Sequence, residues 1–82
     1  MSAAIPKTAG LKKRSFSVAG HRTSVALEPE FWAALESEAR ARRLALAALV
    51  ARIDAGRAER NLASALRVHV LRRALEKTVS AT

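Results

Sequence analysis

The chain has 82 residues, half of them hydrophobic, and it contains no cysteine. That length allows one small domain with a marginal core, and the lack of cysteine excludes disulfides, thiolate metal sites and cysteine nucleophiles. Fifteen lysines and arginines against seven acidic residues give a net charge of +8, which indicates a polyanionic partner such as nucleic acid, an anionic membrane or a phosphorylated ligand.

Residues 1–13 are predicted to form a flexible basic arm. They mix small residues with proline and glycine without any periodicity, and they end in Lys12 and Lys13. A charged arm of this kind either contacts a polyanion or serves only solubility. The longest apolar run, residues 44–51, has eight residues, whereas a helical membrane span needs about 20. With no secretory signal either, we expect a cytoplasmic protein that does not enter a membrane.

Two short strands are predicted next, because residues 15–18 and 22–27 alternate polar and apolar side chains. Gly20 and His21 between them suit a two-residue hairpin loop. That loop pairs Ala19 with Arg22, and then Val18 with Thr23, Ser17 with Ser24 and Phe16 with Val25. The predicted buried face consists of Phe16, Val18, Val25 and Leu27. The predicted open face consists of Ser15, Ser17, Ala19, Arg22, Ser24 and Ala26.

Three helices are predicted after the strands. The first runs from Pro29 to about Arg42, since proline suits a first helical turn and Phe31 and Leu35 recur at four-residue spacing. Trp32 is expected at the margin of that apolar stripe. The turn into the second helix spans residues 42–45, and its stripe is Leu46, Leu49, Val50 and Ile53.

The second helix is expected to end near residues 54–56, where Gly56 acts as a terminator. Asn61 is a good cap for a third helix from Leu62 to about Lys77, and residues 78–82 are expected to fray. This third helix is apolar over a wide arc, so we expect it to lie between elements or subunits. An alternative is that its apolar surface binds another protein.

A strand of six residues needs a partner, and a second copy of the chain around a two-fold axis would supply one. We therefore predict an obligate homodimer. The predicted dimer core consists of Phe16, Val18, Val25, Leu27, Phe31, Leu35, Leu46, Leu49, Val50 and Ile53.

No catalytic site, metal site or cofactor is predicted. His21 lies near Ser17 and Ser24, but no acidic residue is placed to orient its imidazole for nucleophilic catalysis. His69 lies within an apolar stripe, as a satisfied core or interface histidine does, and partners for a metal are absent. The three glycines do not form a phosphate-binding loop.

The segment Thr23–Glu30, followed by the two apolar helical stripes, resembles ribbon-helix-helix proteins. Residues 20–25, Phe31–Trp32 and Asn61–Arg67 look like a small bacterial subgroup with a basic N-terminal arm and a third helix. The resemblance covers about residues 14–75. It implies a mainly α domain at residues 14–77 with a short N-terminal β ribbon. It also implies an intertwined homodimer whose intermolecular antiparallel sheet enters the major groove, while the N-terminus of the second helix grips a phosphate.

The main functional hypothesis is a homodimeric DNA-binding protein that regulates transcription. The resemblance implies Arg22, Ser24 and Ala26 as outward ribbon positions and residues 43–46 as the phosphate-contacting turn. Alternatively, two copies of the Arg/His/Ser face bind a two-fold-symmetric anion, such as the cyclic dinucleotide cyclic di-GMP, alone or as a control of DNA binding. The candidate DNA- or ligand-binding residues are Lys12, Lys13, Arg14, Ser17, His21, Arg22, Ser24, Ala26 and Arg43.

Overall fold

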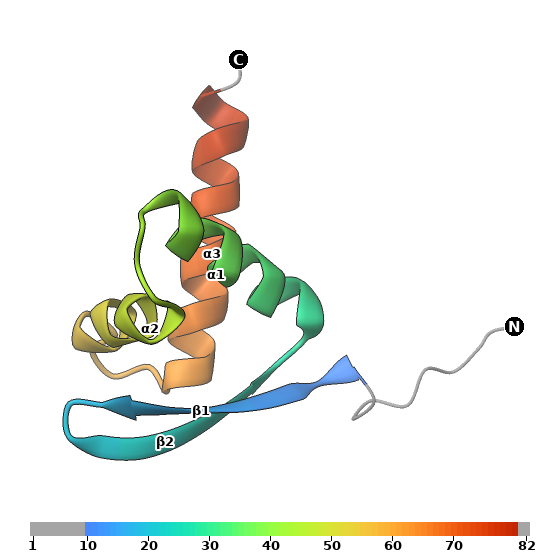
Figure 1. Ribbon diagram of the computed structural model, residues 1–82. Helices are drawn as coiled ribbons and strands as arrows, with labels where there is room; N and C mark the ends of the chain where they lie inside the picture. The colour runs from blue at the N-terminus through green and yellow to red at the C-terminus, as the bar shows by residue number, and fades with distance from the viewer. Residues whose placement is uncertain (1–9, 81–82) are drawn as a thin grey trace, which may run out of the picture.

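The computed structural model describes residues 10–80, so the predictions for residues 1–9 of the arm and for residues 81–82 lie outside the described residues. Its elements are β1 (Lys12–Val18), β2 (His21–Leu27), α1 (Pro29–Ala41), α2 (Leu46–Ala55) and α3 (Leu62–Ser80). The two strands form an antiparallel hairpin at one end of the molecule, and the helices stack on one side of it (Figure 1). This arrangement confirms the predicted ribbon followed by helices.

The element bounds differ from the predicted ones at three places. β1 begins at Lys12, so Lys12 and Lys13 belong to the sheet rather than to an arm. α1 ends at Ala41, one residue before the predicted end, and α3 continues past Lys77 to Ser80. The cap of α3 is confirmed, because the Ser64 backbone N–H donates to Asn61 Oδ1 at 2.8 Å.

The hairpin loop predicted at Gly20 and His21 is wrong by one residue. The loop is Ala19–Gly20, whose φ angles of 53° and 82° are the pair of positive values that a type I′ turn requires. His21 is instead the first residue of β2. The pairs are Val18 with His21, Ser17 with Arg22, Phe16 with Thr23, Ser15 with Ser24, Arg14 with Val25, Lys13 with Ala26 and Lys12 with Leu27. This register is two residues from the predicted one, so each side chain within the strands keeps its predicted face. Ala19, predicted on the open face, lies in the turn instead.

The hydrophobic core lies between the inner face of the hairpin and the three helices. Its buried members are Phe16, Val18, Val25, Leu27, Trp32, Leu35, Ala39, Leu49, Val50, Ala65 and Leu66. Phe31, Leu46 and Ile53 pack against this core but stay partly exposed. All ten residues predicted as a dimer core therefore take part in a core within one chain.

Trp32 was predicted at the margin of α1, and that prediction is wrong. Its side chain is 2% exposed, its ring centroid lies 5.8 Å from that of Phe16, and its Nε1–H donates to the Lys12 carbonyl at 2.8 Å. The hairpin crosses α1 on this side, so the buried arc of the helix is wider than the stripe read from helical spacing. Phe31, the neighbour assigned to the core, is the more exposed of the two aromatic residues.

The partner strand of β2 comes from the same chain. β1 occupies the position that was predicted for a strand of a second copy, so strand pairing alone does not require a dimer. Each strand of this two-stranded sheet still has one unpaired edge. An intermolecular sheet remains a prediction.

α3 is attached to α1 through polar contacts as well as through the core. Glu38 Oε1 on α1 accepts a hydrogen bond from His69 Nε2 at 2.8 Å, and Glu38 Oε2 lies 3.8 Å from Arg73 Nε. His69 thus has the satisfied environment that was predicted. The far half of α3 projects beyond the other helices (Figure 1), where Leu71 and Leu75 are each 55% exposed. None of the helices in residues 10–80 combines the length and hydrophobicity that a transmembrane span needs.

Candidate nucleic-acid interface

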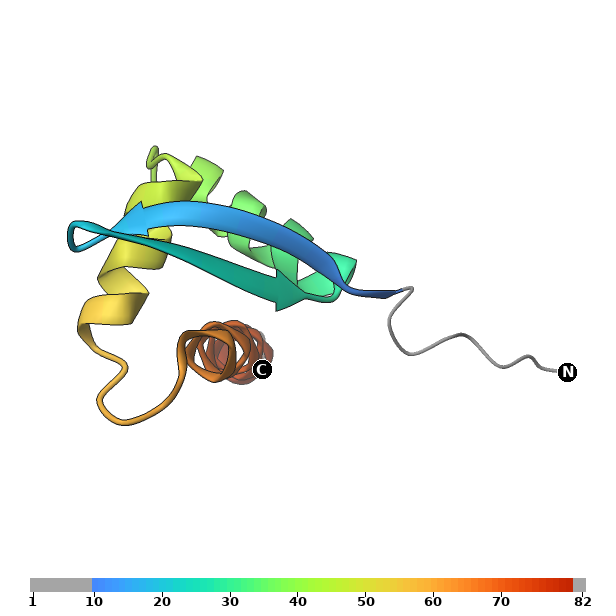
Figure 2. The same cartoon turned by 90° about the horizontal axis from the view of Figure 1, so that it is seen from below.

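The outer face of the hairpin is not covered by the helices. It presents Lys13, Ser15 and Ser17 from β1 opposite Ala26, Ser24 and Arg22 from β2. All of these side chains are exposed except that of Ala26, which is half-buried. Seen from below, the hairpin lies in front of α1 and α2, and α3 lies beside it (Figure 2). We call these six residues the open face.

Hydroxyl groups occupy the middle of the open face and cations flank them. The Ser15 and Ser24 hydroxyls are 2.9 Å apart, and Arg22 Nη1 donates to Ser17 Oγ at 3.3 Å. Within residues 10–80, neither Lys13 nor Arg22 forms an ion pair. The charge of both side chains is therefore available to an external anion.

Arg14, also predicted to bind, lies on the other side of the hairpin. It pairs with buried Val25 across the sheet, its Nη1 donates to Glu36 Oε2 at 2.6 Å, and its guanidinium lies 5.0 Å from the centroid of the Trp32 ring. Glu36 was not predicted as its partner. The spacing offered a signal, because Glu36 follows Trp32 by four residues and so lies on the same side of α1.

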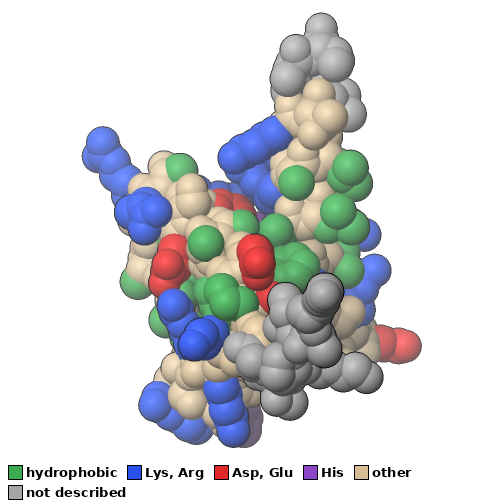
Figure 3. All heavy atoms as spheres, turned by 90° about the vertical axis from the view of Figure 1, so that its right-hand side faces the viewer, with side chains coloured by type: hydrophobic (Ala, Val, Ile, Leu, Met, Phe, Trp, Pro, Cys, Tyr) green, Lys and Arg blue, Asp and Glu red, His purple; other side chains and the backbone are tan. Residues whose placement is uncertain are grey.

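The remaining candidates are spread around the hairpin rather than gathered on the open face. Lys12 is exposed on the helix side, and His21 is exposed beside the turn, opposite Val18. In the space-filling view, lysine and arginine side chains lie at the hairpin end of the molecule and also over the helices above it (Figure 3). Of the nine predicted binding residues, five lie on the open face: Lys13, Ser17, Arg22, Ser24 and Ala26.

The turn before α2 has the geometry of an uncapped helix start. Arg43 is exposed with a φ of 59°, and the Leu44 N–H donates to the Ala39 carbonyl at 2.8 Å. Ala45 occupies the cap position and makes no side-chain hydrogen bond to the helix. The first amides of α2 are thus left to water or to an external acceptor, for which a phosphate is well suited.

Glu28 lies where β2 meets α1, and its charge is satisfied locally. A hydrogen bond from its own backbone, and then one from Arg67 Nε at 3.1 Å, hold the pKa of this carboxyl below its usual value. Arg67 also lies over the Phe31 ring, 5.8 Å from the centroid. The Arg67 guanidinium therefore stabilises the junction of β2, α1 and α3 rather than binding an external partner.

The family model described as a ribbon-helix-helix domain matches residues 11–74 of the chain. The match includes both strands, α1, α2 and most of α3, and it agrees with the resemblance found at residues 14–75. Proteins of this family generally bind DNA as transcription regulators, typically form dimers and are typically not enzymes. Neither a curated protein nor a solved structure matches the chain at a significant level.

Proposed function

Because the chain belongs to the ribbon-helix-helix domain family, we propose that it is a homodimeric, cytoplasmic transcription regulator that contacts DNA through the open face. The observation that carries this proposal is the exposure of Arg22 and Lys13 on a face that the helices leave uncovered. A two-stranded ribbon has the dimensions to enter the major groove of B-DNA.

The side chains of the open face differ in what they can offer to DNA. Arg22 and Lys13 donate to phosphates or to guanine edges, and the Ser15 and Ser24 hydroxyls can exchange their mutual contact for contacts with bases. Ala26 has no hydrogen-bonding group in its side chain, so its role is apolar contact with a thymine methyl. The uncapped start of α2, together with Arg43, would hold a phosphate beside the groove.

A second copy of the chain would double these contacts. The unpaired edge of β2 offers backbone groups to the same strand of a partner, and such a pairing would extend the open face across a two-fold axis. Affinity would then come mainly from phosphate neutralisation, and its signature is a steep loss of binding as salt rises.

The test is a titration of labelled duplex DNA, followed by fluorescence anisotropy, with the full chain and three variants. Arg22→Ala is expected to weaken binding at least about tenfold and to make the salt dependence shallower between about 50 and 200 mM. Lys77→Ala removes the same charge from the far end of α3 and is expected to change affinity less than about threefold. Arg14→Ala is expected to resemble Lys77→Ala, since Glu36 already pairs with Arg14.

Equal losses for Arg22→Ala and Lys77→Ala would show that binding depends on net charge alone and would reject the open face as the contact surface. A greater loss for Arg14→Ala than for Arg22→Ala would move the contact to the helix side of the hairpin.

A second candidate function is binding of cyclic di-GMP by two copies of the open face. The observation that favours it is the presence of Arg22, which has no ion pair among residues 10–80, beside the hydroxyls of Ser15, Ser17 and Ser24 on one exposed surface. Arginine binds phosphates in a bidentate manner and stacks on bases. Calorimetry would detect it. We expect one cyclic dinucleotide per dimer and loss of the heat in Arg22→Ala; no heat from the unmodified chain would reject this function.

A further inference from the structure

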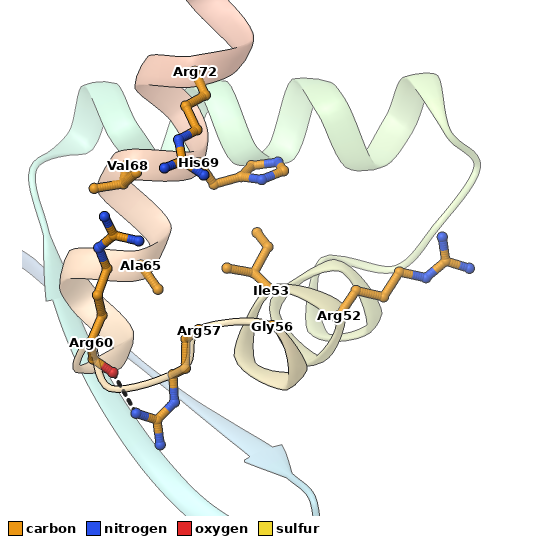
Figure 4. Close-up of a pocket in the computed structure, with 9 residues that line it drawn as sticks. All are labelled: Arg52, Ile53, Gly56, Arg57, Arg60, Ala65, Val68, His69 and Arg72. Atoms are coloured by element: carbon orange, nitrogen blue, oxygen red, sulfur yellow. Dashed lines mark hydrogen bonds between the residues drawn. The ribbon is translucent and has the colours of Figure 1, made fainter.

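A groove of about 260 Å³ lies between the end of α2 and the start of α3. Its apolar wall is formed by Ile53 of α2 and by Ala65 and Val68 of α3 (Figure 4). Four arginines, Arg52, Arg57, Arg60 and Arg72, also line it. Neither the open face nor the uncapped start of α2 contributes a residue to this groove.

Three of the four arginines, Arg52, Arg60 and Arg72, have no side-chain hydrogen bond or ion pair among residues 10–80. Arg57 is engaged, since its Nε donates to Asp54 Oδ1 at 2.6 Å and its Nη1 to the Arg60 carbonyl at 2.5 Å. By contrast, the guanidinium groups of Arg60 and Arg72 extend from opposite ends of the groove toward Val68 (Figure 4), and no described acceptor lies within hydrogen-bonding distance of either. Positive groups held around one space favour an anion between them.

The apolar wall indicates that the anion carries an apolar body. Ala65 is buried, and Ile53 and Val68 are half-buried, so they present carbon surface to the groove rather than further donors. His69 closes one side with its Nε2 fixed by Glu38 at 2.8 Å. A volume of about 260 Å³ lies just below the usual range for small-molecule sites, which suits one small ligand rather than a peptide.

The groove is remote from the proposed phosphate contact on the same helix. α2 has 10 residues, so at 1.5 Å per residue its two ends are about 15 Å apart. The groove lies at the C-terminal end, whereas the uncapped amides lie at the other end. One phosphate therefore does not reach both places.

We propose that this groove binds a small organic phosphate with an aromatic body, such as a nucleoside monophosphate. Arg60 and Arg72 would hold the phosphate through paired N–H donors, and Ile53, Ala65 and Val68 would contact the flat base. This site is independent of the proposed DNA contact, and it occupies a different surface from the one suggested for a cyclic dinucleotide.

The test is calorimetry on the full chain with GMP as the probe. GMP is expected to bind with a Kd below about 1 mM, and the double substitution Arg60→Ala/Arg72→Ala is expected to weaken it at least about tenfold. Both side chains are exposed, so the helical circular dichroism of this variant should match that of the unmodified chain. Arg22→Ala serves as the control and is expected to leave GMP binding unchanged, whether or not the chain binds DNA.

Two further probes separate the parts of the proposal. Guanosine, which lacks the phosphate, and inorganic phosphate, which lacks the base, are each expected to bind at least about tenfold more weakly than GMP. The proposal fails if GMP gives no heat, if inorganic phosphate binds as tightly as GMP, or if Arg22→Ala abolishes the heat while the double variant retains it. If GMP gives no heat and the double variant also loses DNA affinity, the two arginines form a DNA backbone contact instead.

Discussion

The two adjacent aromatic residues of α1 give a direct test of the fold. Helical spacing assigns Phe31 to the core and Trp32 to its margin, whereas the structure buries Trp32 and leaves Phe31 partly exposed. Replacing each by alanine should therefore rank their contributions to stability. We expect Trp32→Ala to lower the free energy of unfolding far more than Phe31→Ala does.

The magnitude follows from burial. A fully buried tryptophan removes about 150–250 Å² from water, worth about 4–6 kcal/mol at 25 cal/mol per Å², and large-to-small core substitutions of this kind cost about 3–5 kcal/mol. The Lys12 carbonyl also loses its 2.8 Å hydrogen bond from Nε1, a further loss of about 1 kcal/mol. Phe31 keeps part of its ring in water, so its replacement should cost about 1–2 kcal/mol.

Urea unfolding followed by circular dichroism at a fixed protein concentration would measure both losses. A domain of this size is stable by only about 4–12 kcal/mol, so Trp32→Phe, with an expected loss of about 1–2 kcal/mol, provides a measurable variant if Trp32→Ala does not fold. A larger loss for Phe31→Ala than for Trp32→Ala would refute the packing described here. It would also indicate that Phe31 is buried by a second copy of the chain.

Three further outcomes are expected. Ala19→Asn should stabilise the chain by about 0.5–1 kcal/mol in urea unfolding, because asparagine tolerates the positive φ of this turn position; a loop at residues 20–21 would make the substitution neutral. Because folding lowers the pKa of Glu28, its ionised carboxylate stabilises the fold fully above the unfolded pKa of 4.5, and this stabilisation is lost as pH falls through the folded pKa. Between about pH 6 and pH 3, the melting temperature of Glu28→Gln should therefore fall less than that of the unmodified chain. Glu38→Gln should lower the free energy of unfolding by about 1–3 kcal/mol, since the Glu38 side chain is 9% exposed and faces Arg42, His69 and Arg73. Glu36→Gln, at a more exposed ion pair, should lower it by less than about 1 kcal/mol. Equal losses in the two variants would contradict this ranking.

Most of the fold was predicted from hydrophobic patterns with the period of a strand, two residues, or of a helix, about 3.6 residues. The alternation of Phe16, Val18, Val25 and Leu27 was sufficient to assign the faces of both strands, and the error in the hairpin loop left those faces unchanged because it moved the register by two residues. The loop was predicted one residue too late because Gly20 was placed first in it, whereas the first loop residue is Ala19. Alanine is uncommon at positive φ, so little in the sequence indicated this. The position of Trp32 was beyond reach of a single-helix pattern, because it depends on where the hairpin crosses α1.

The candidate binding residues were predicted less completely than the fold. Face alternation brought Ser17, Arg22, Ser24 and Ala26 together correctly, because they belong to two adjacent strands of known parity. Charge alone could not distinguish Arg14, which pairs with Glu36, from Arg22, which has no acidic partner among residues 10–80. The groove between α2 and α3 was missed for a related reason: Arg60 in the loop before α3 and Arg72 on α3 line one space with Ile53 only because α2 packs against α3.

The projection of α3 affects how the oligomeric state of this chain can be measured. The radius of gyration is 14.0 Å, against about 12 Å for a compact domain of this length. An elongated particle diffuses more slowly than a sphere of equal mass, so on a sizing column a single copy of this chain would elute early, toward the position of a compact pair. Light scattering or sedimentation equilibrium, which report molar mass directly, will count the copies without that bias.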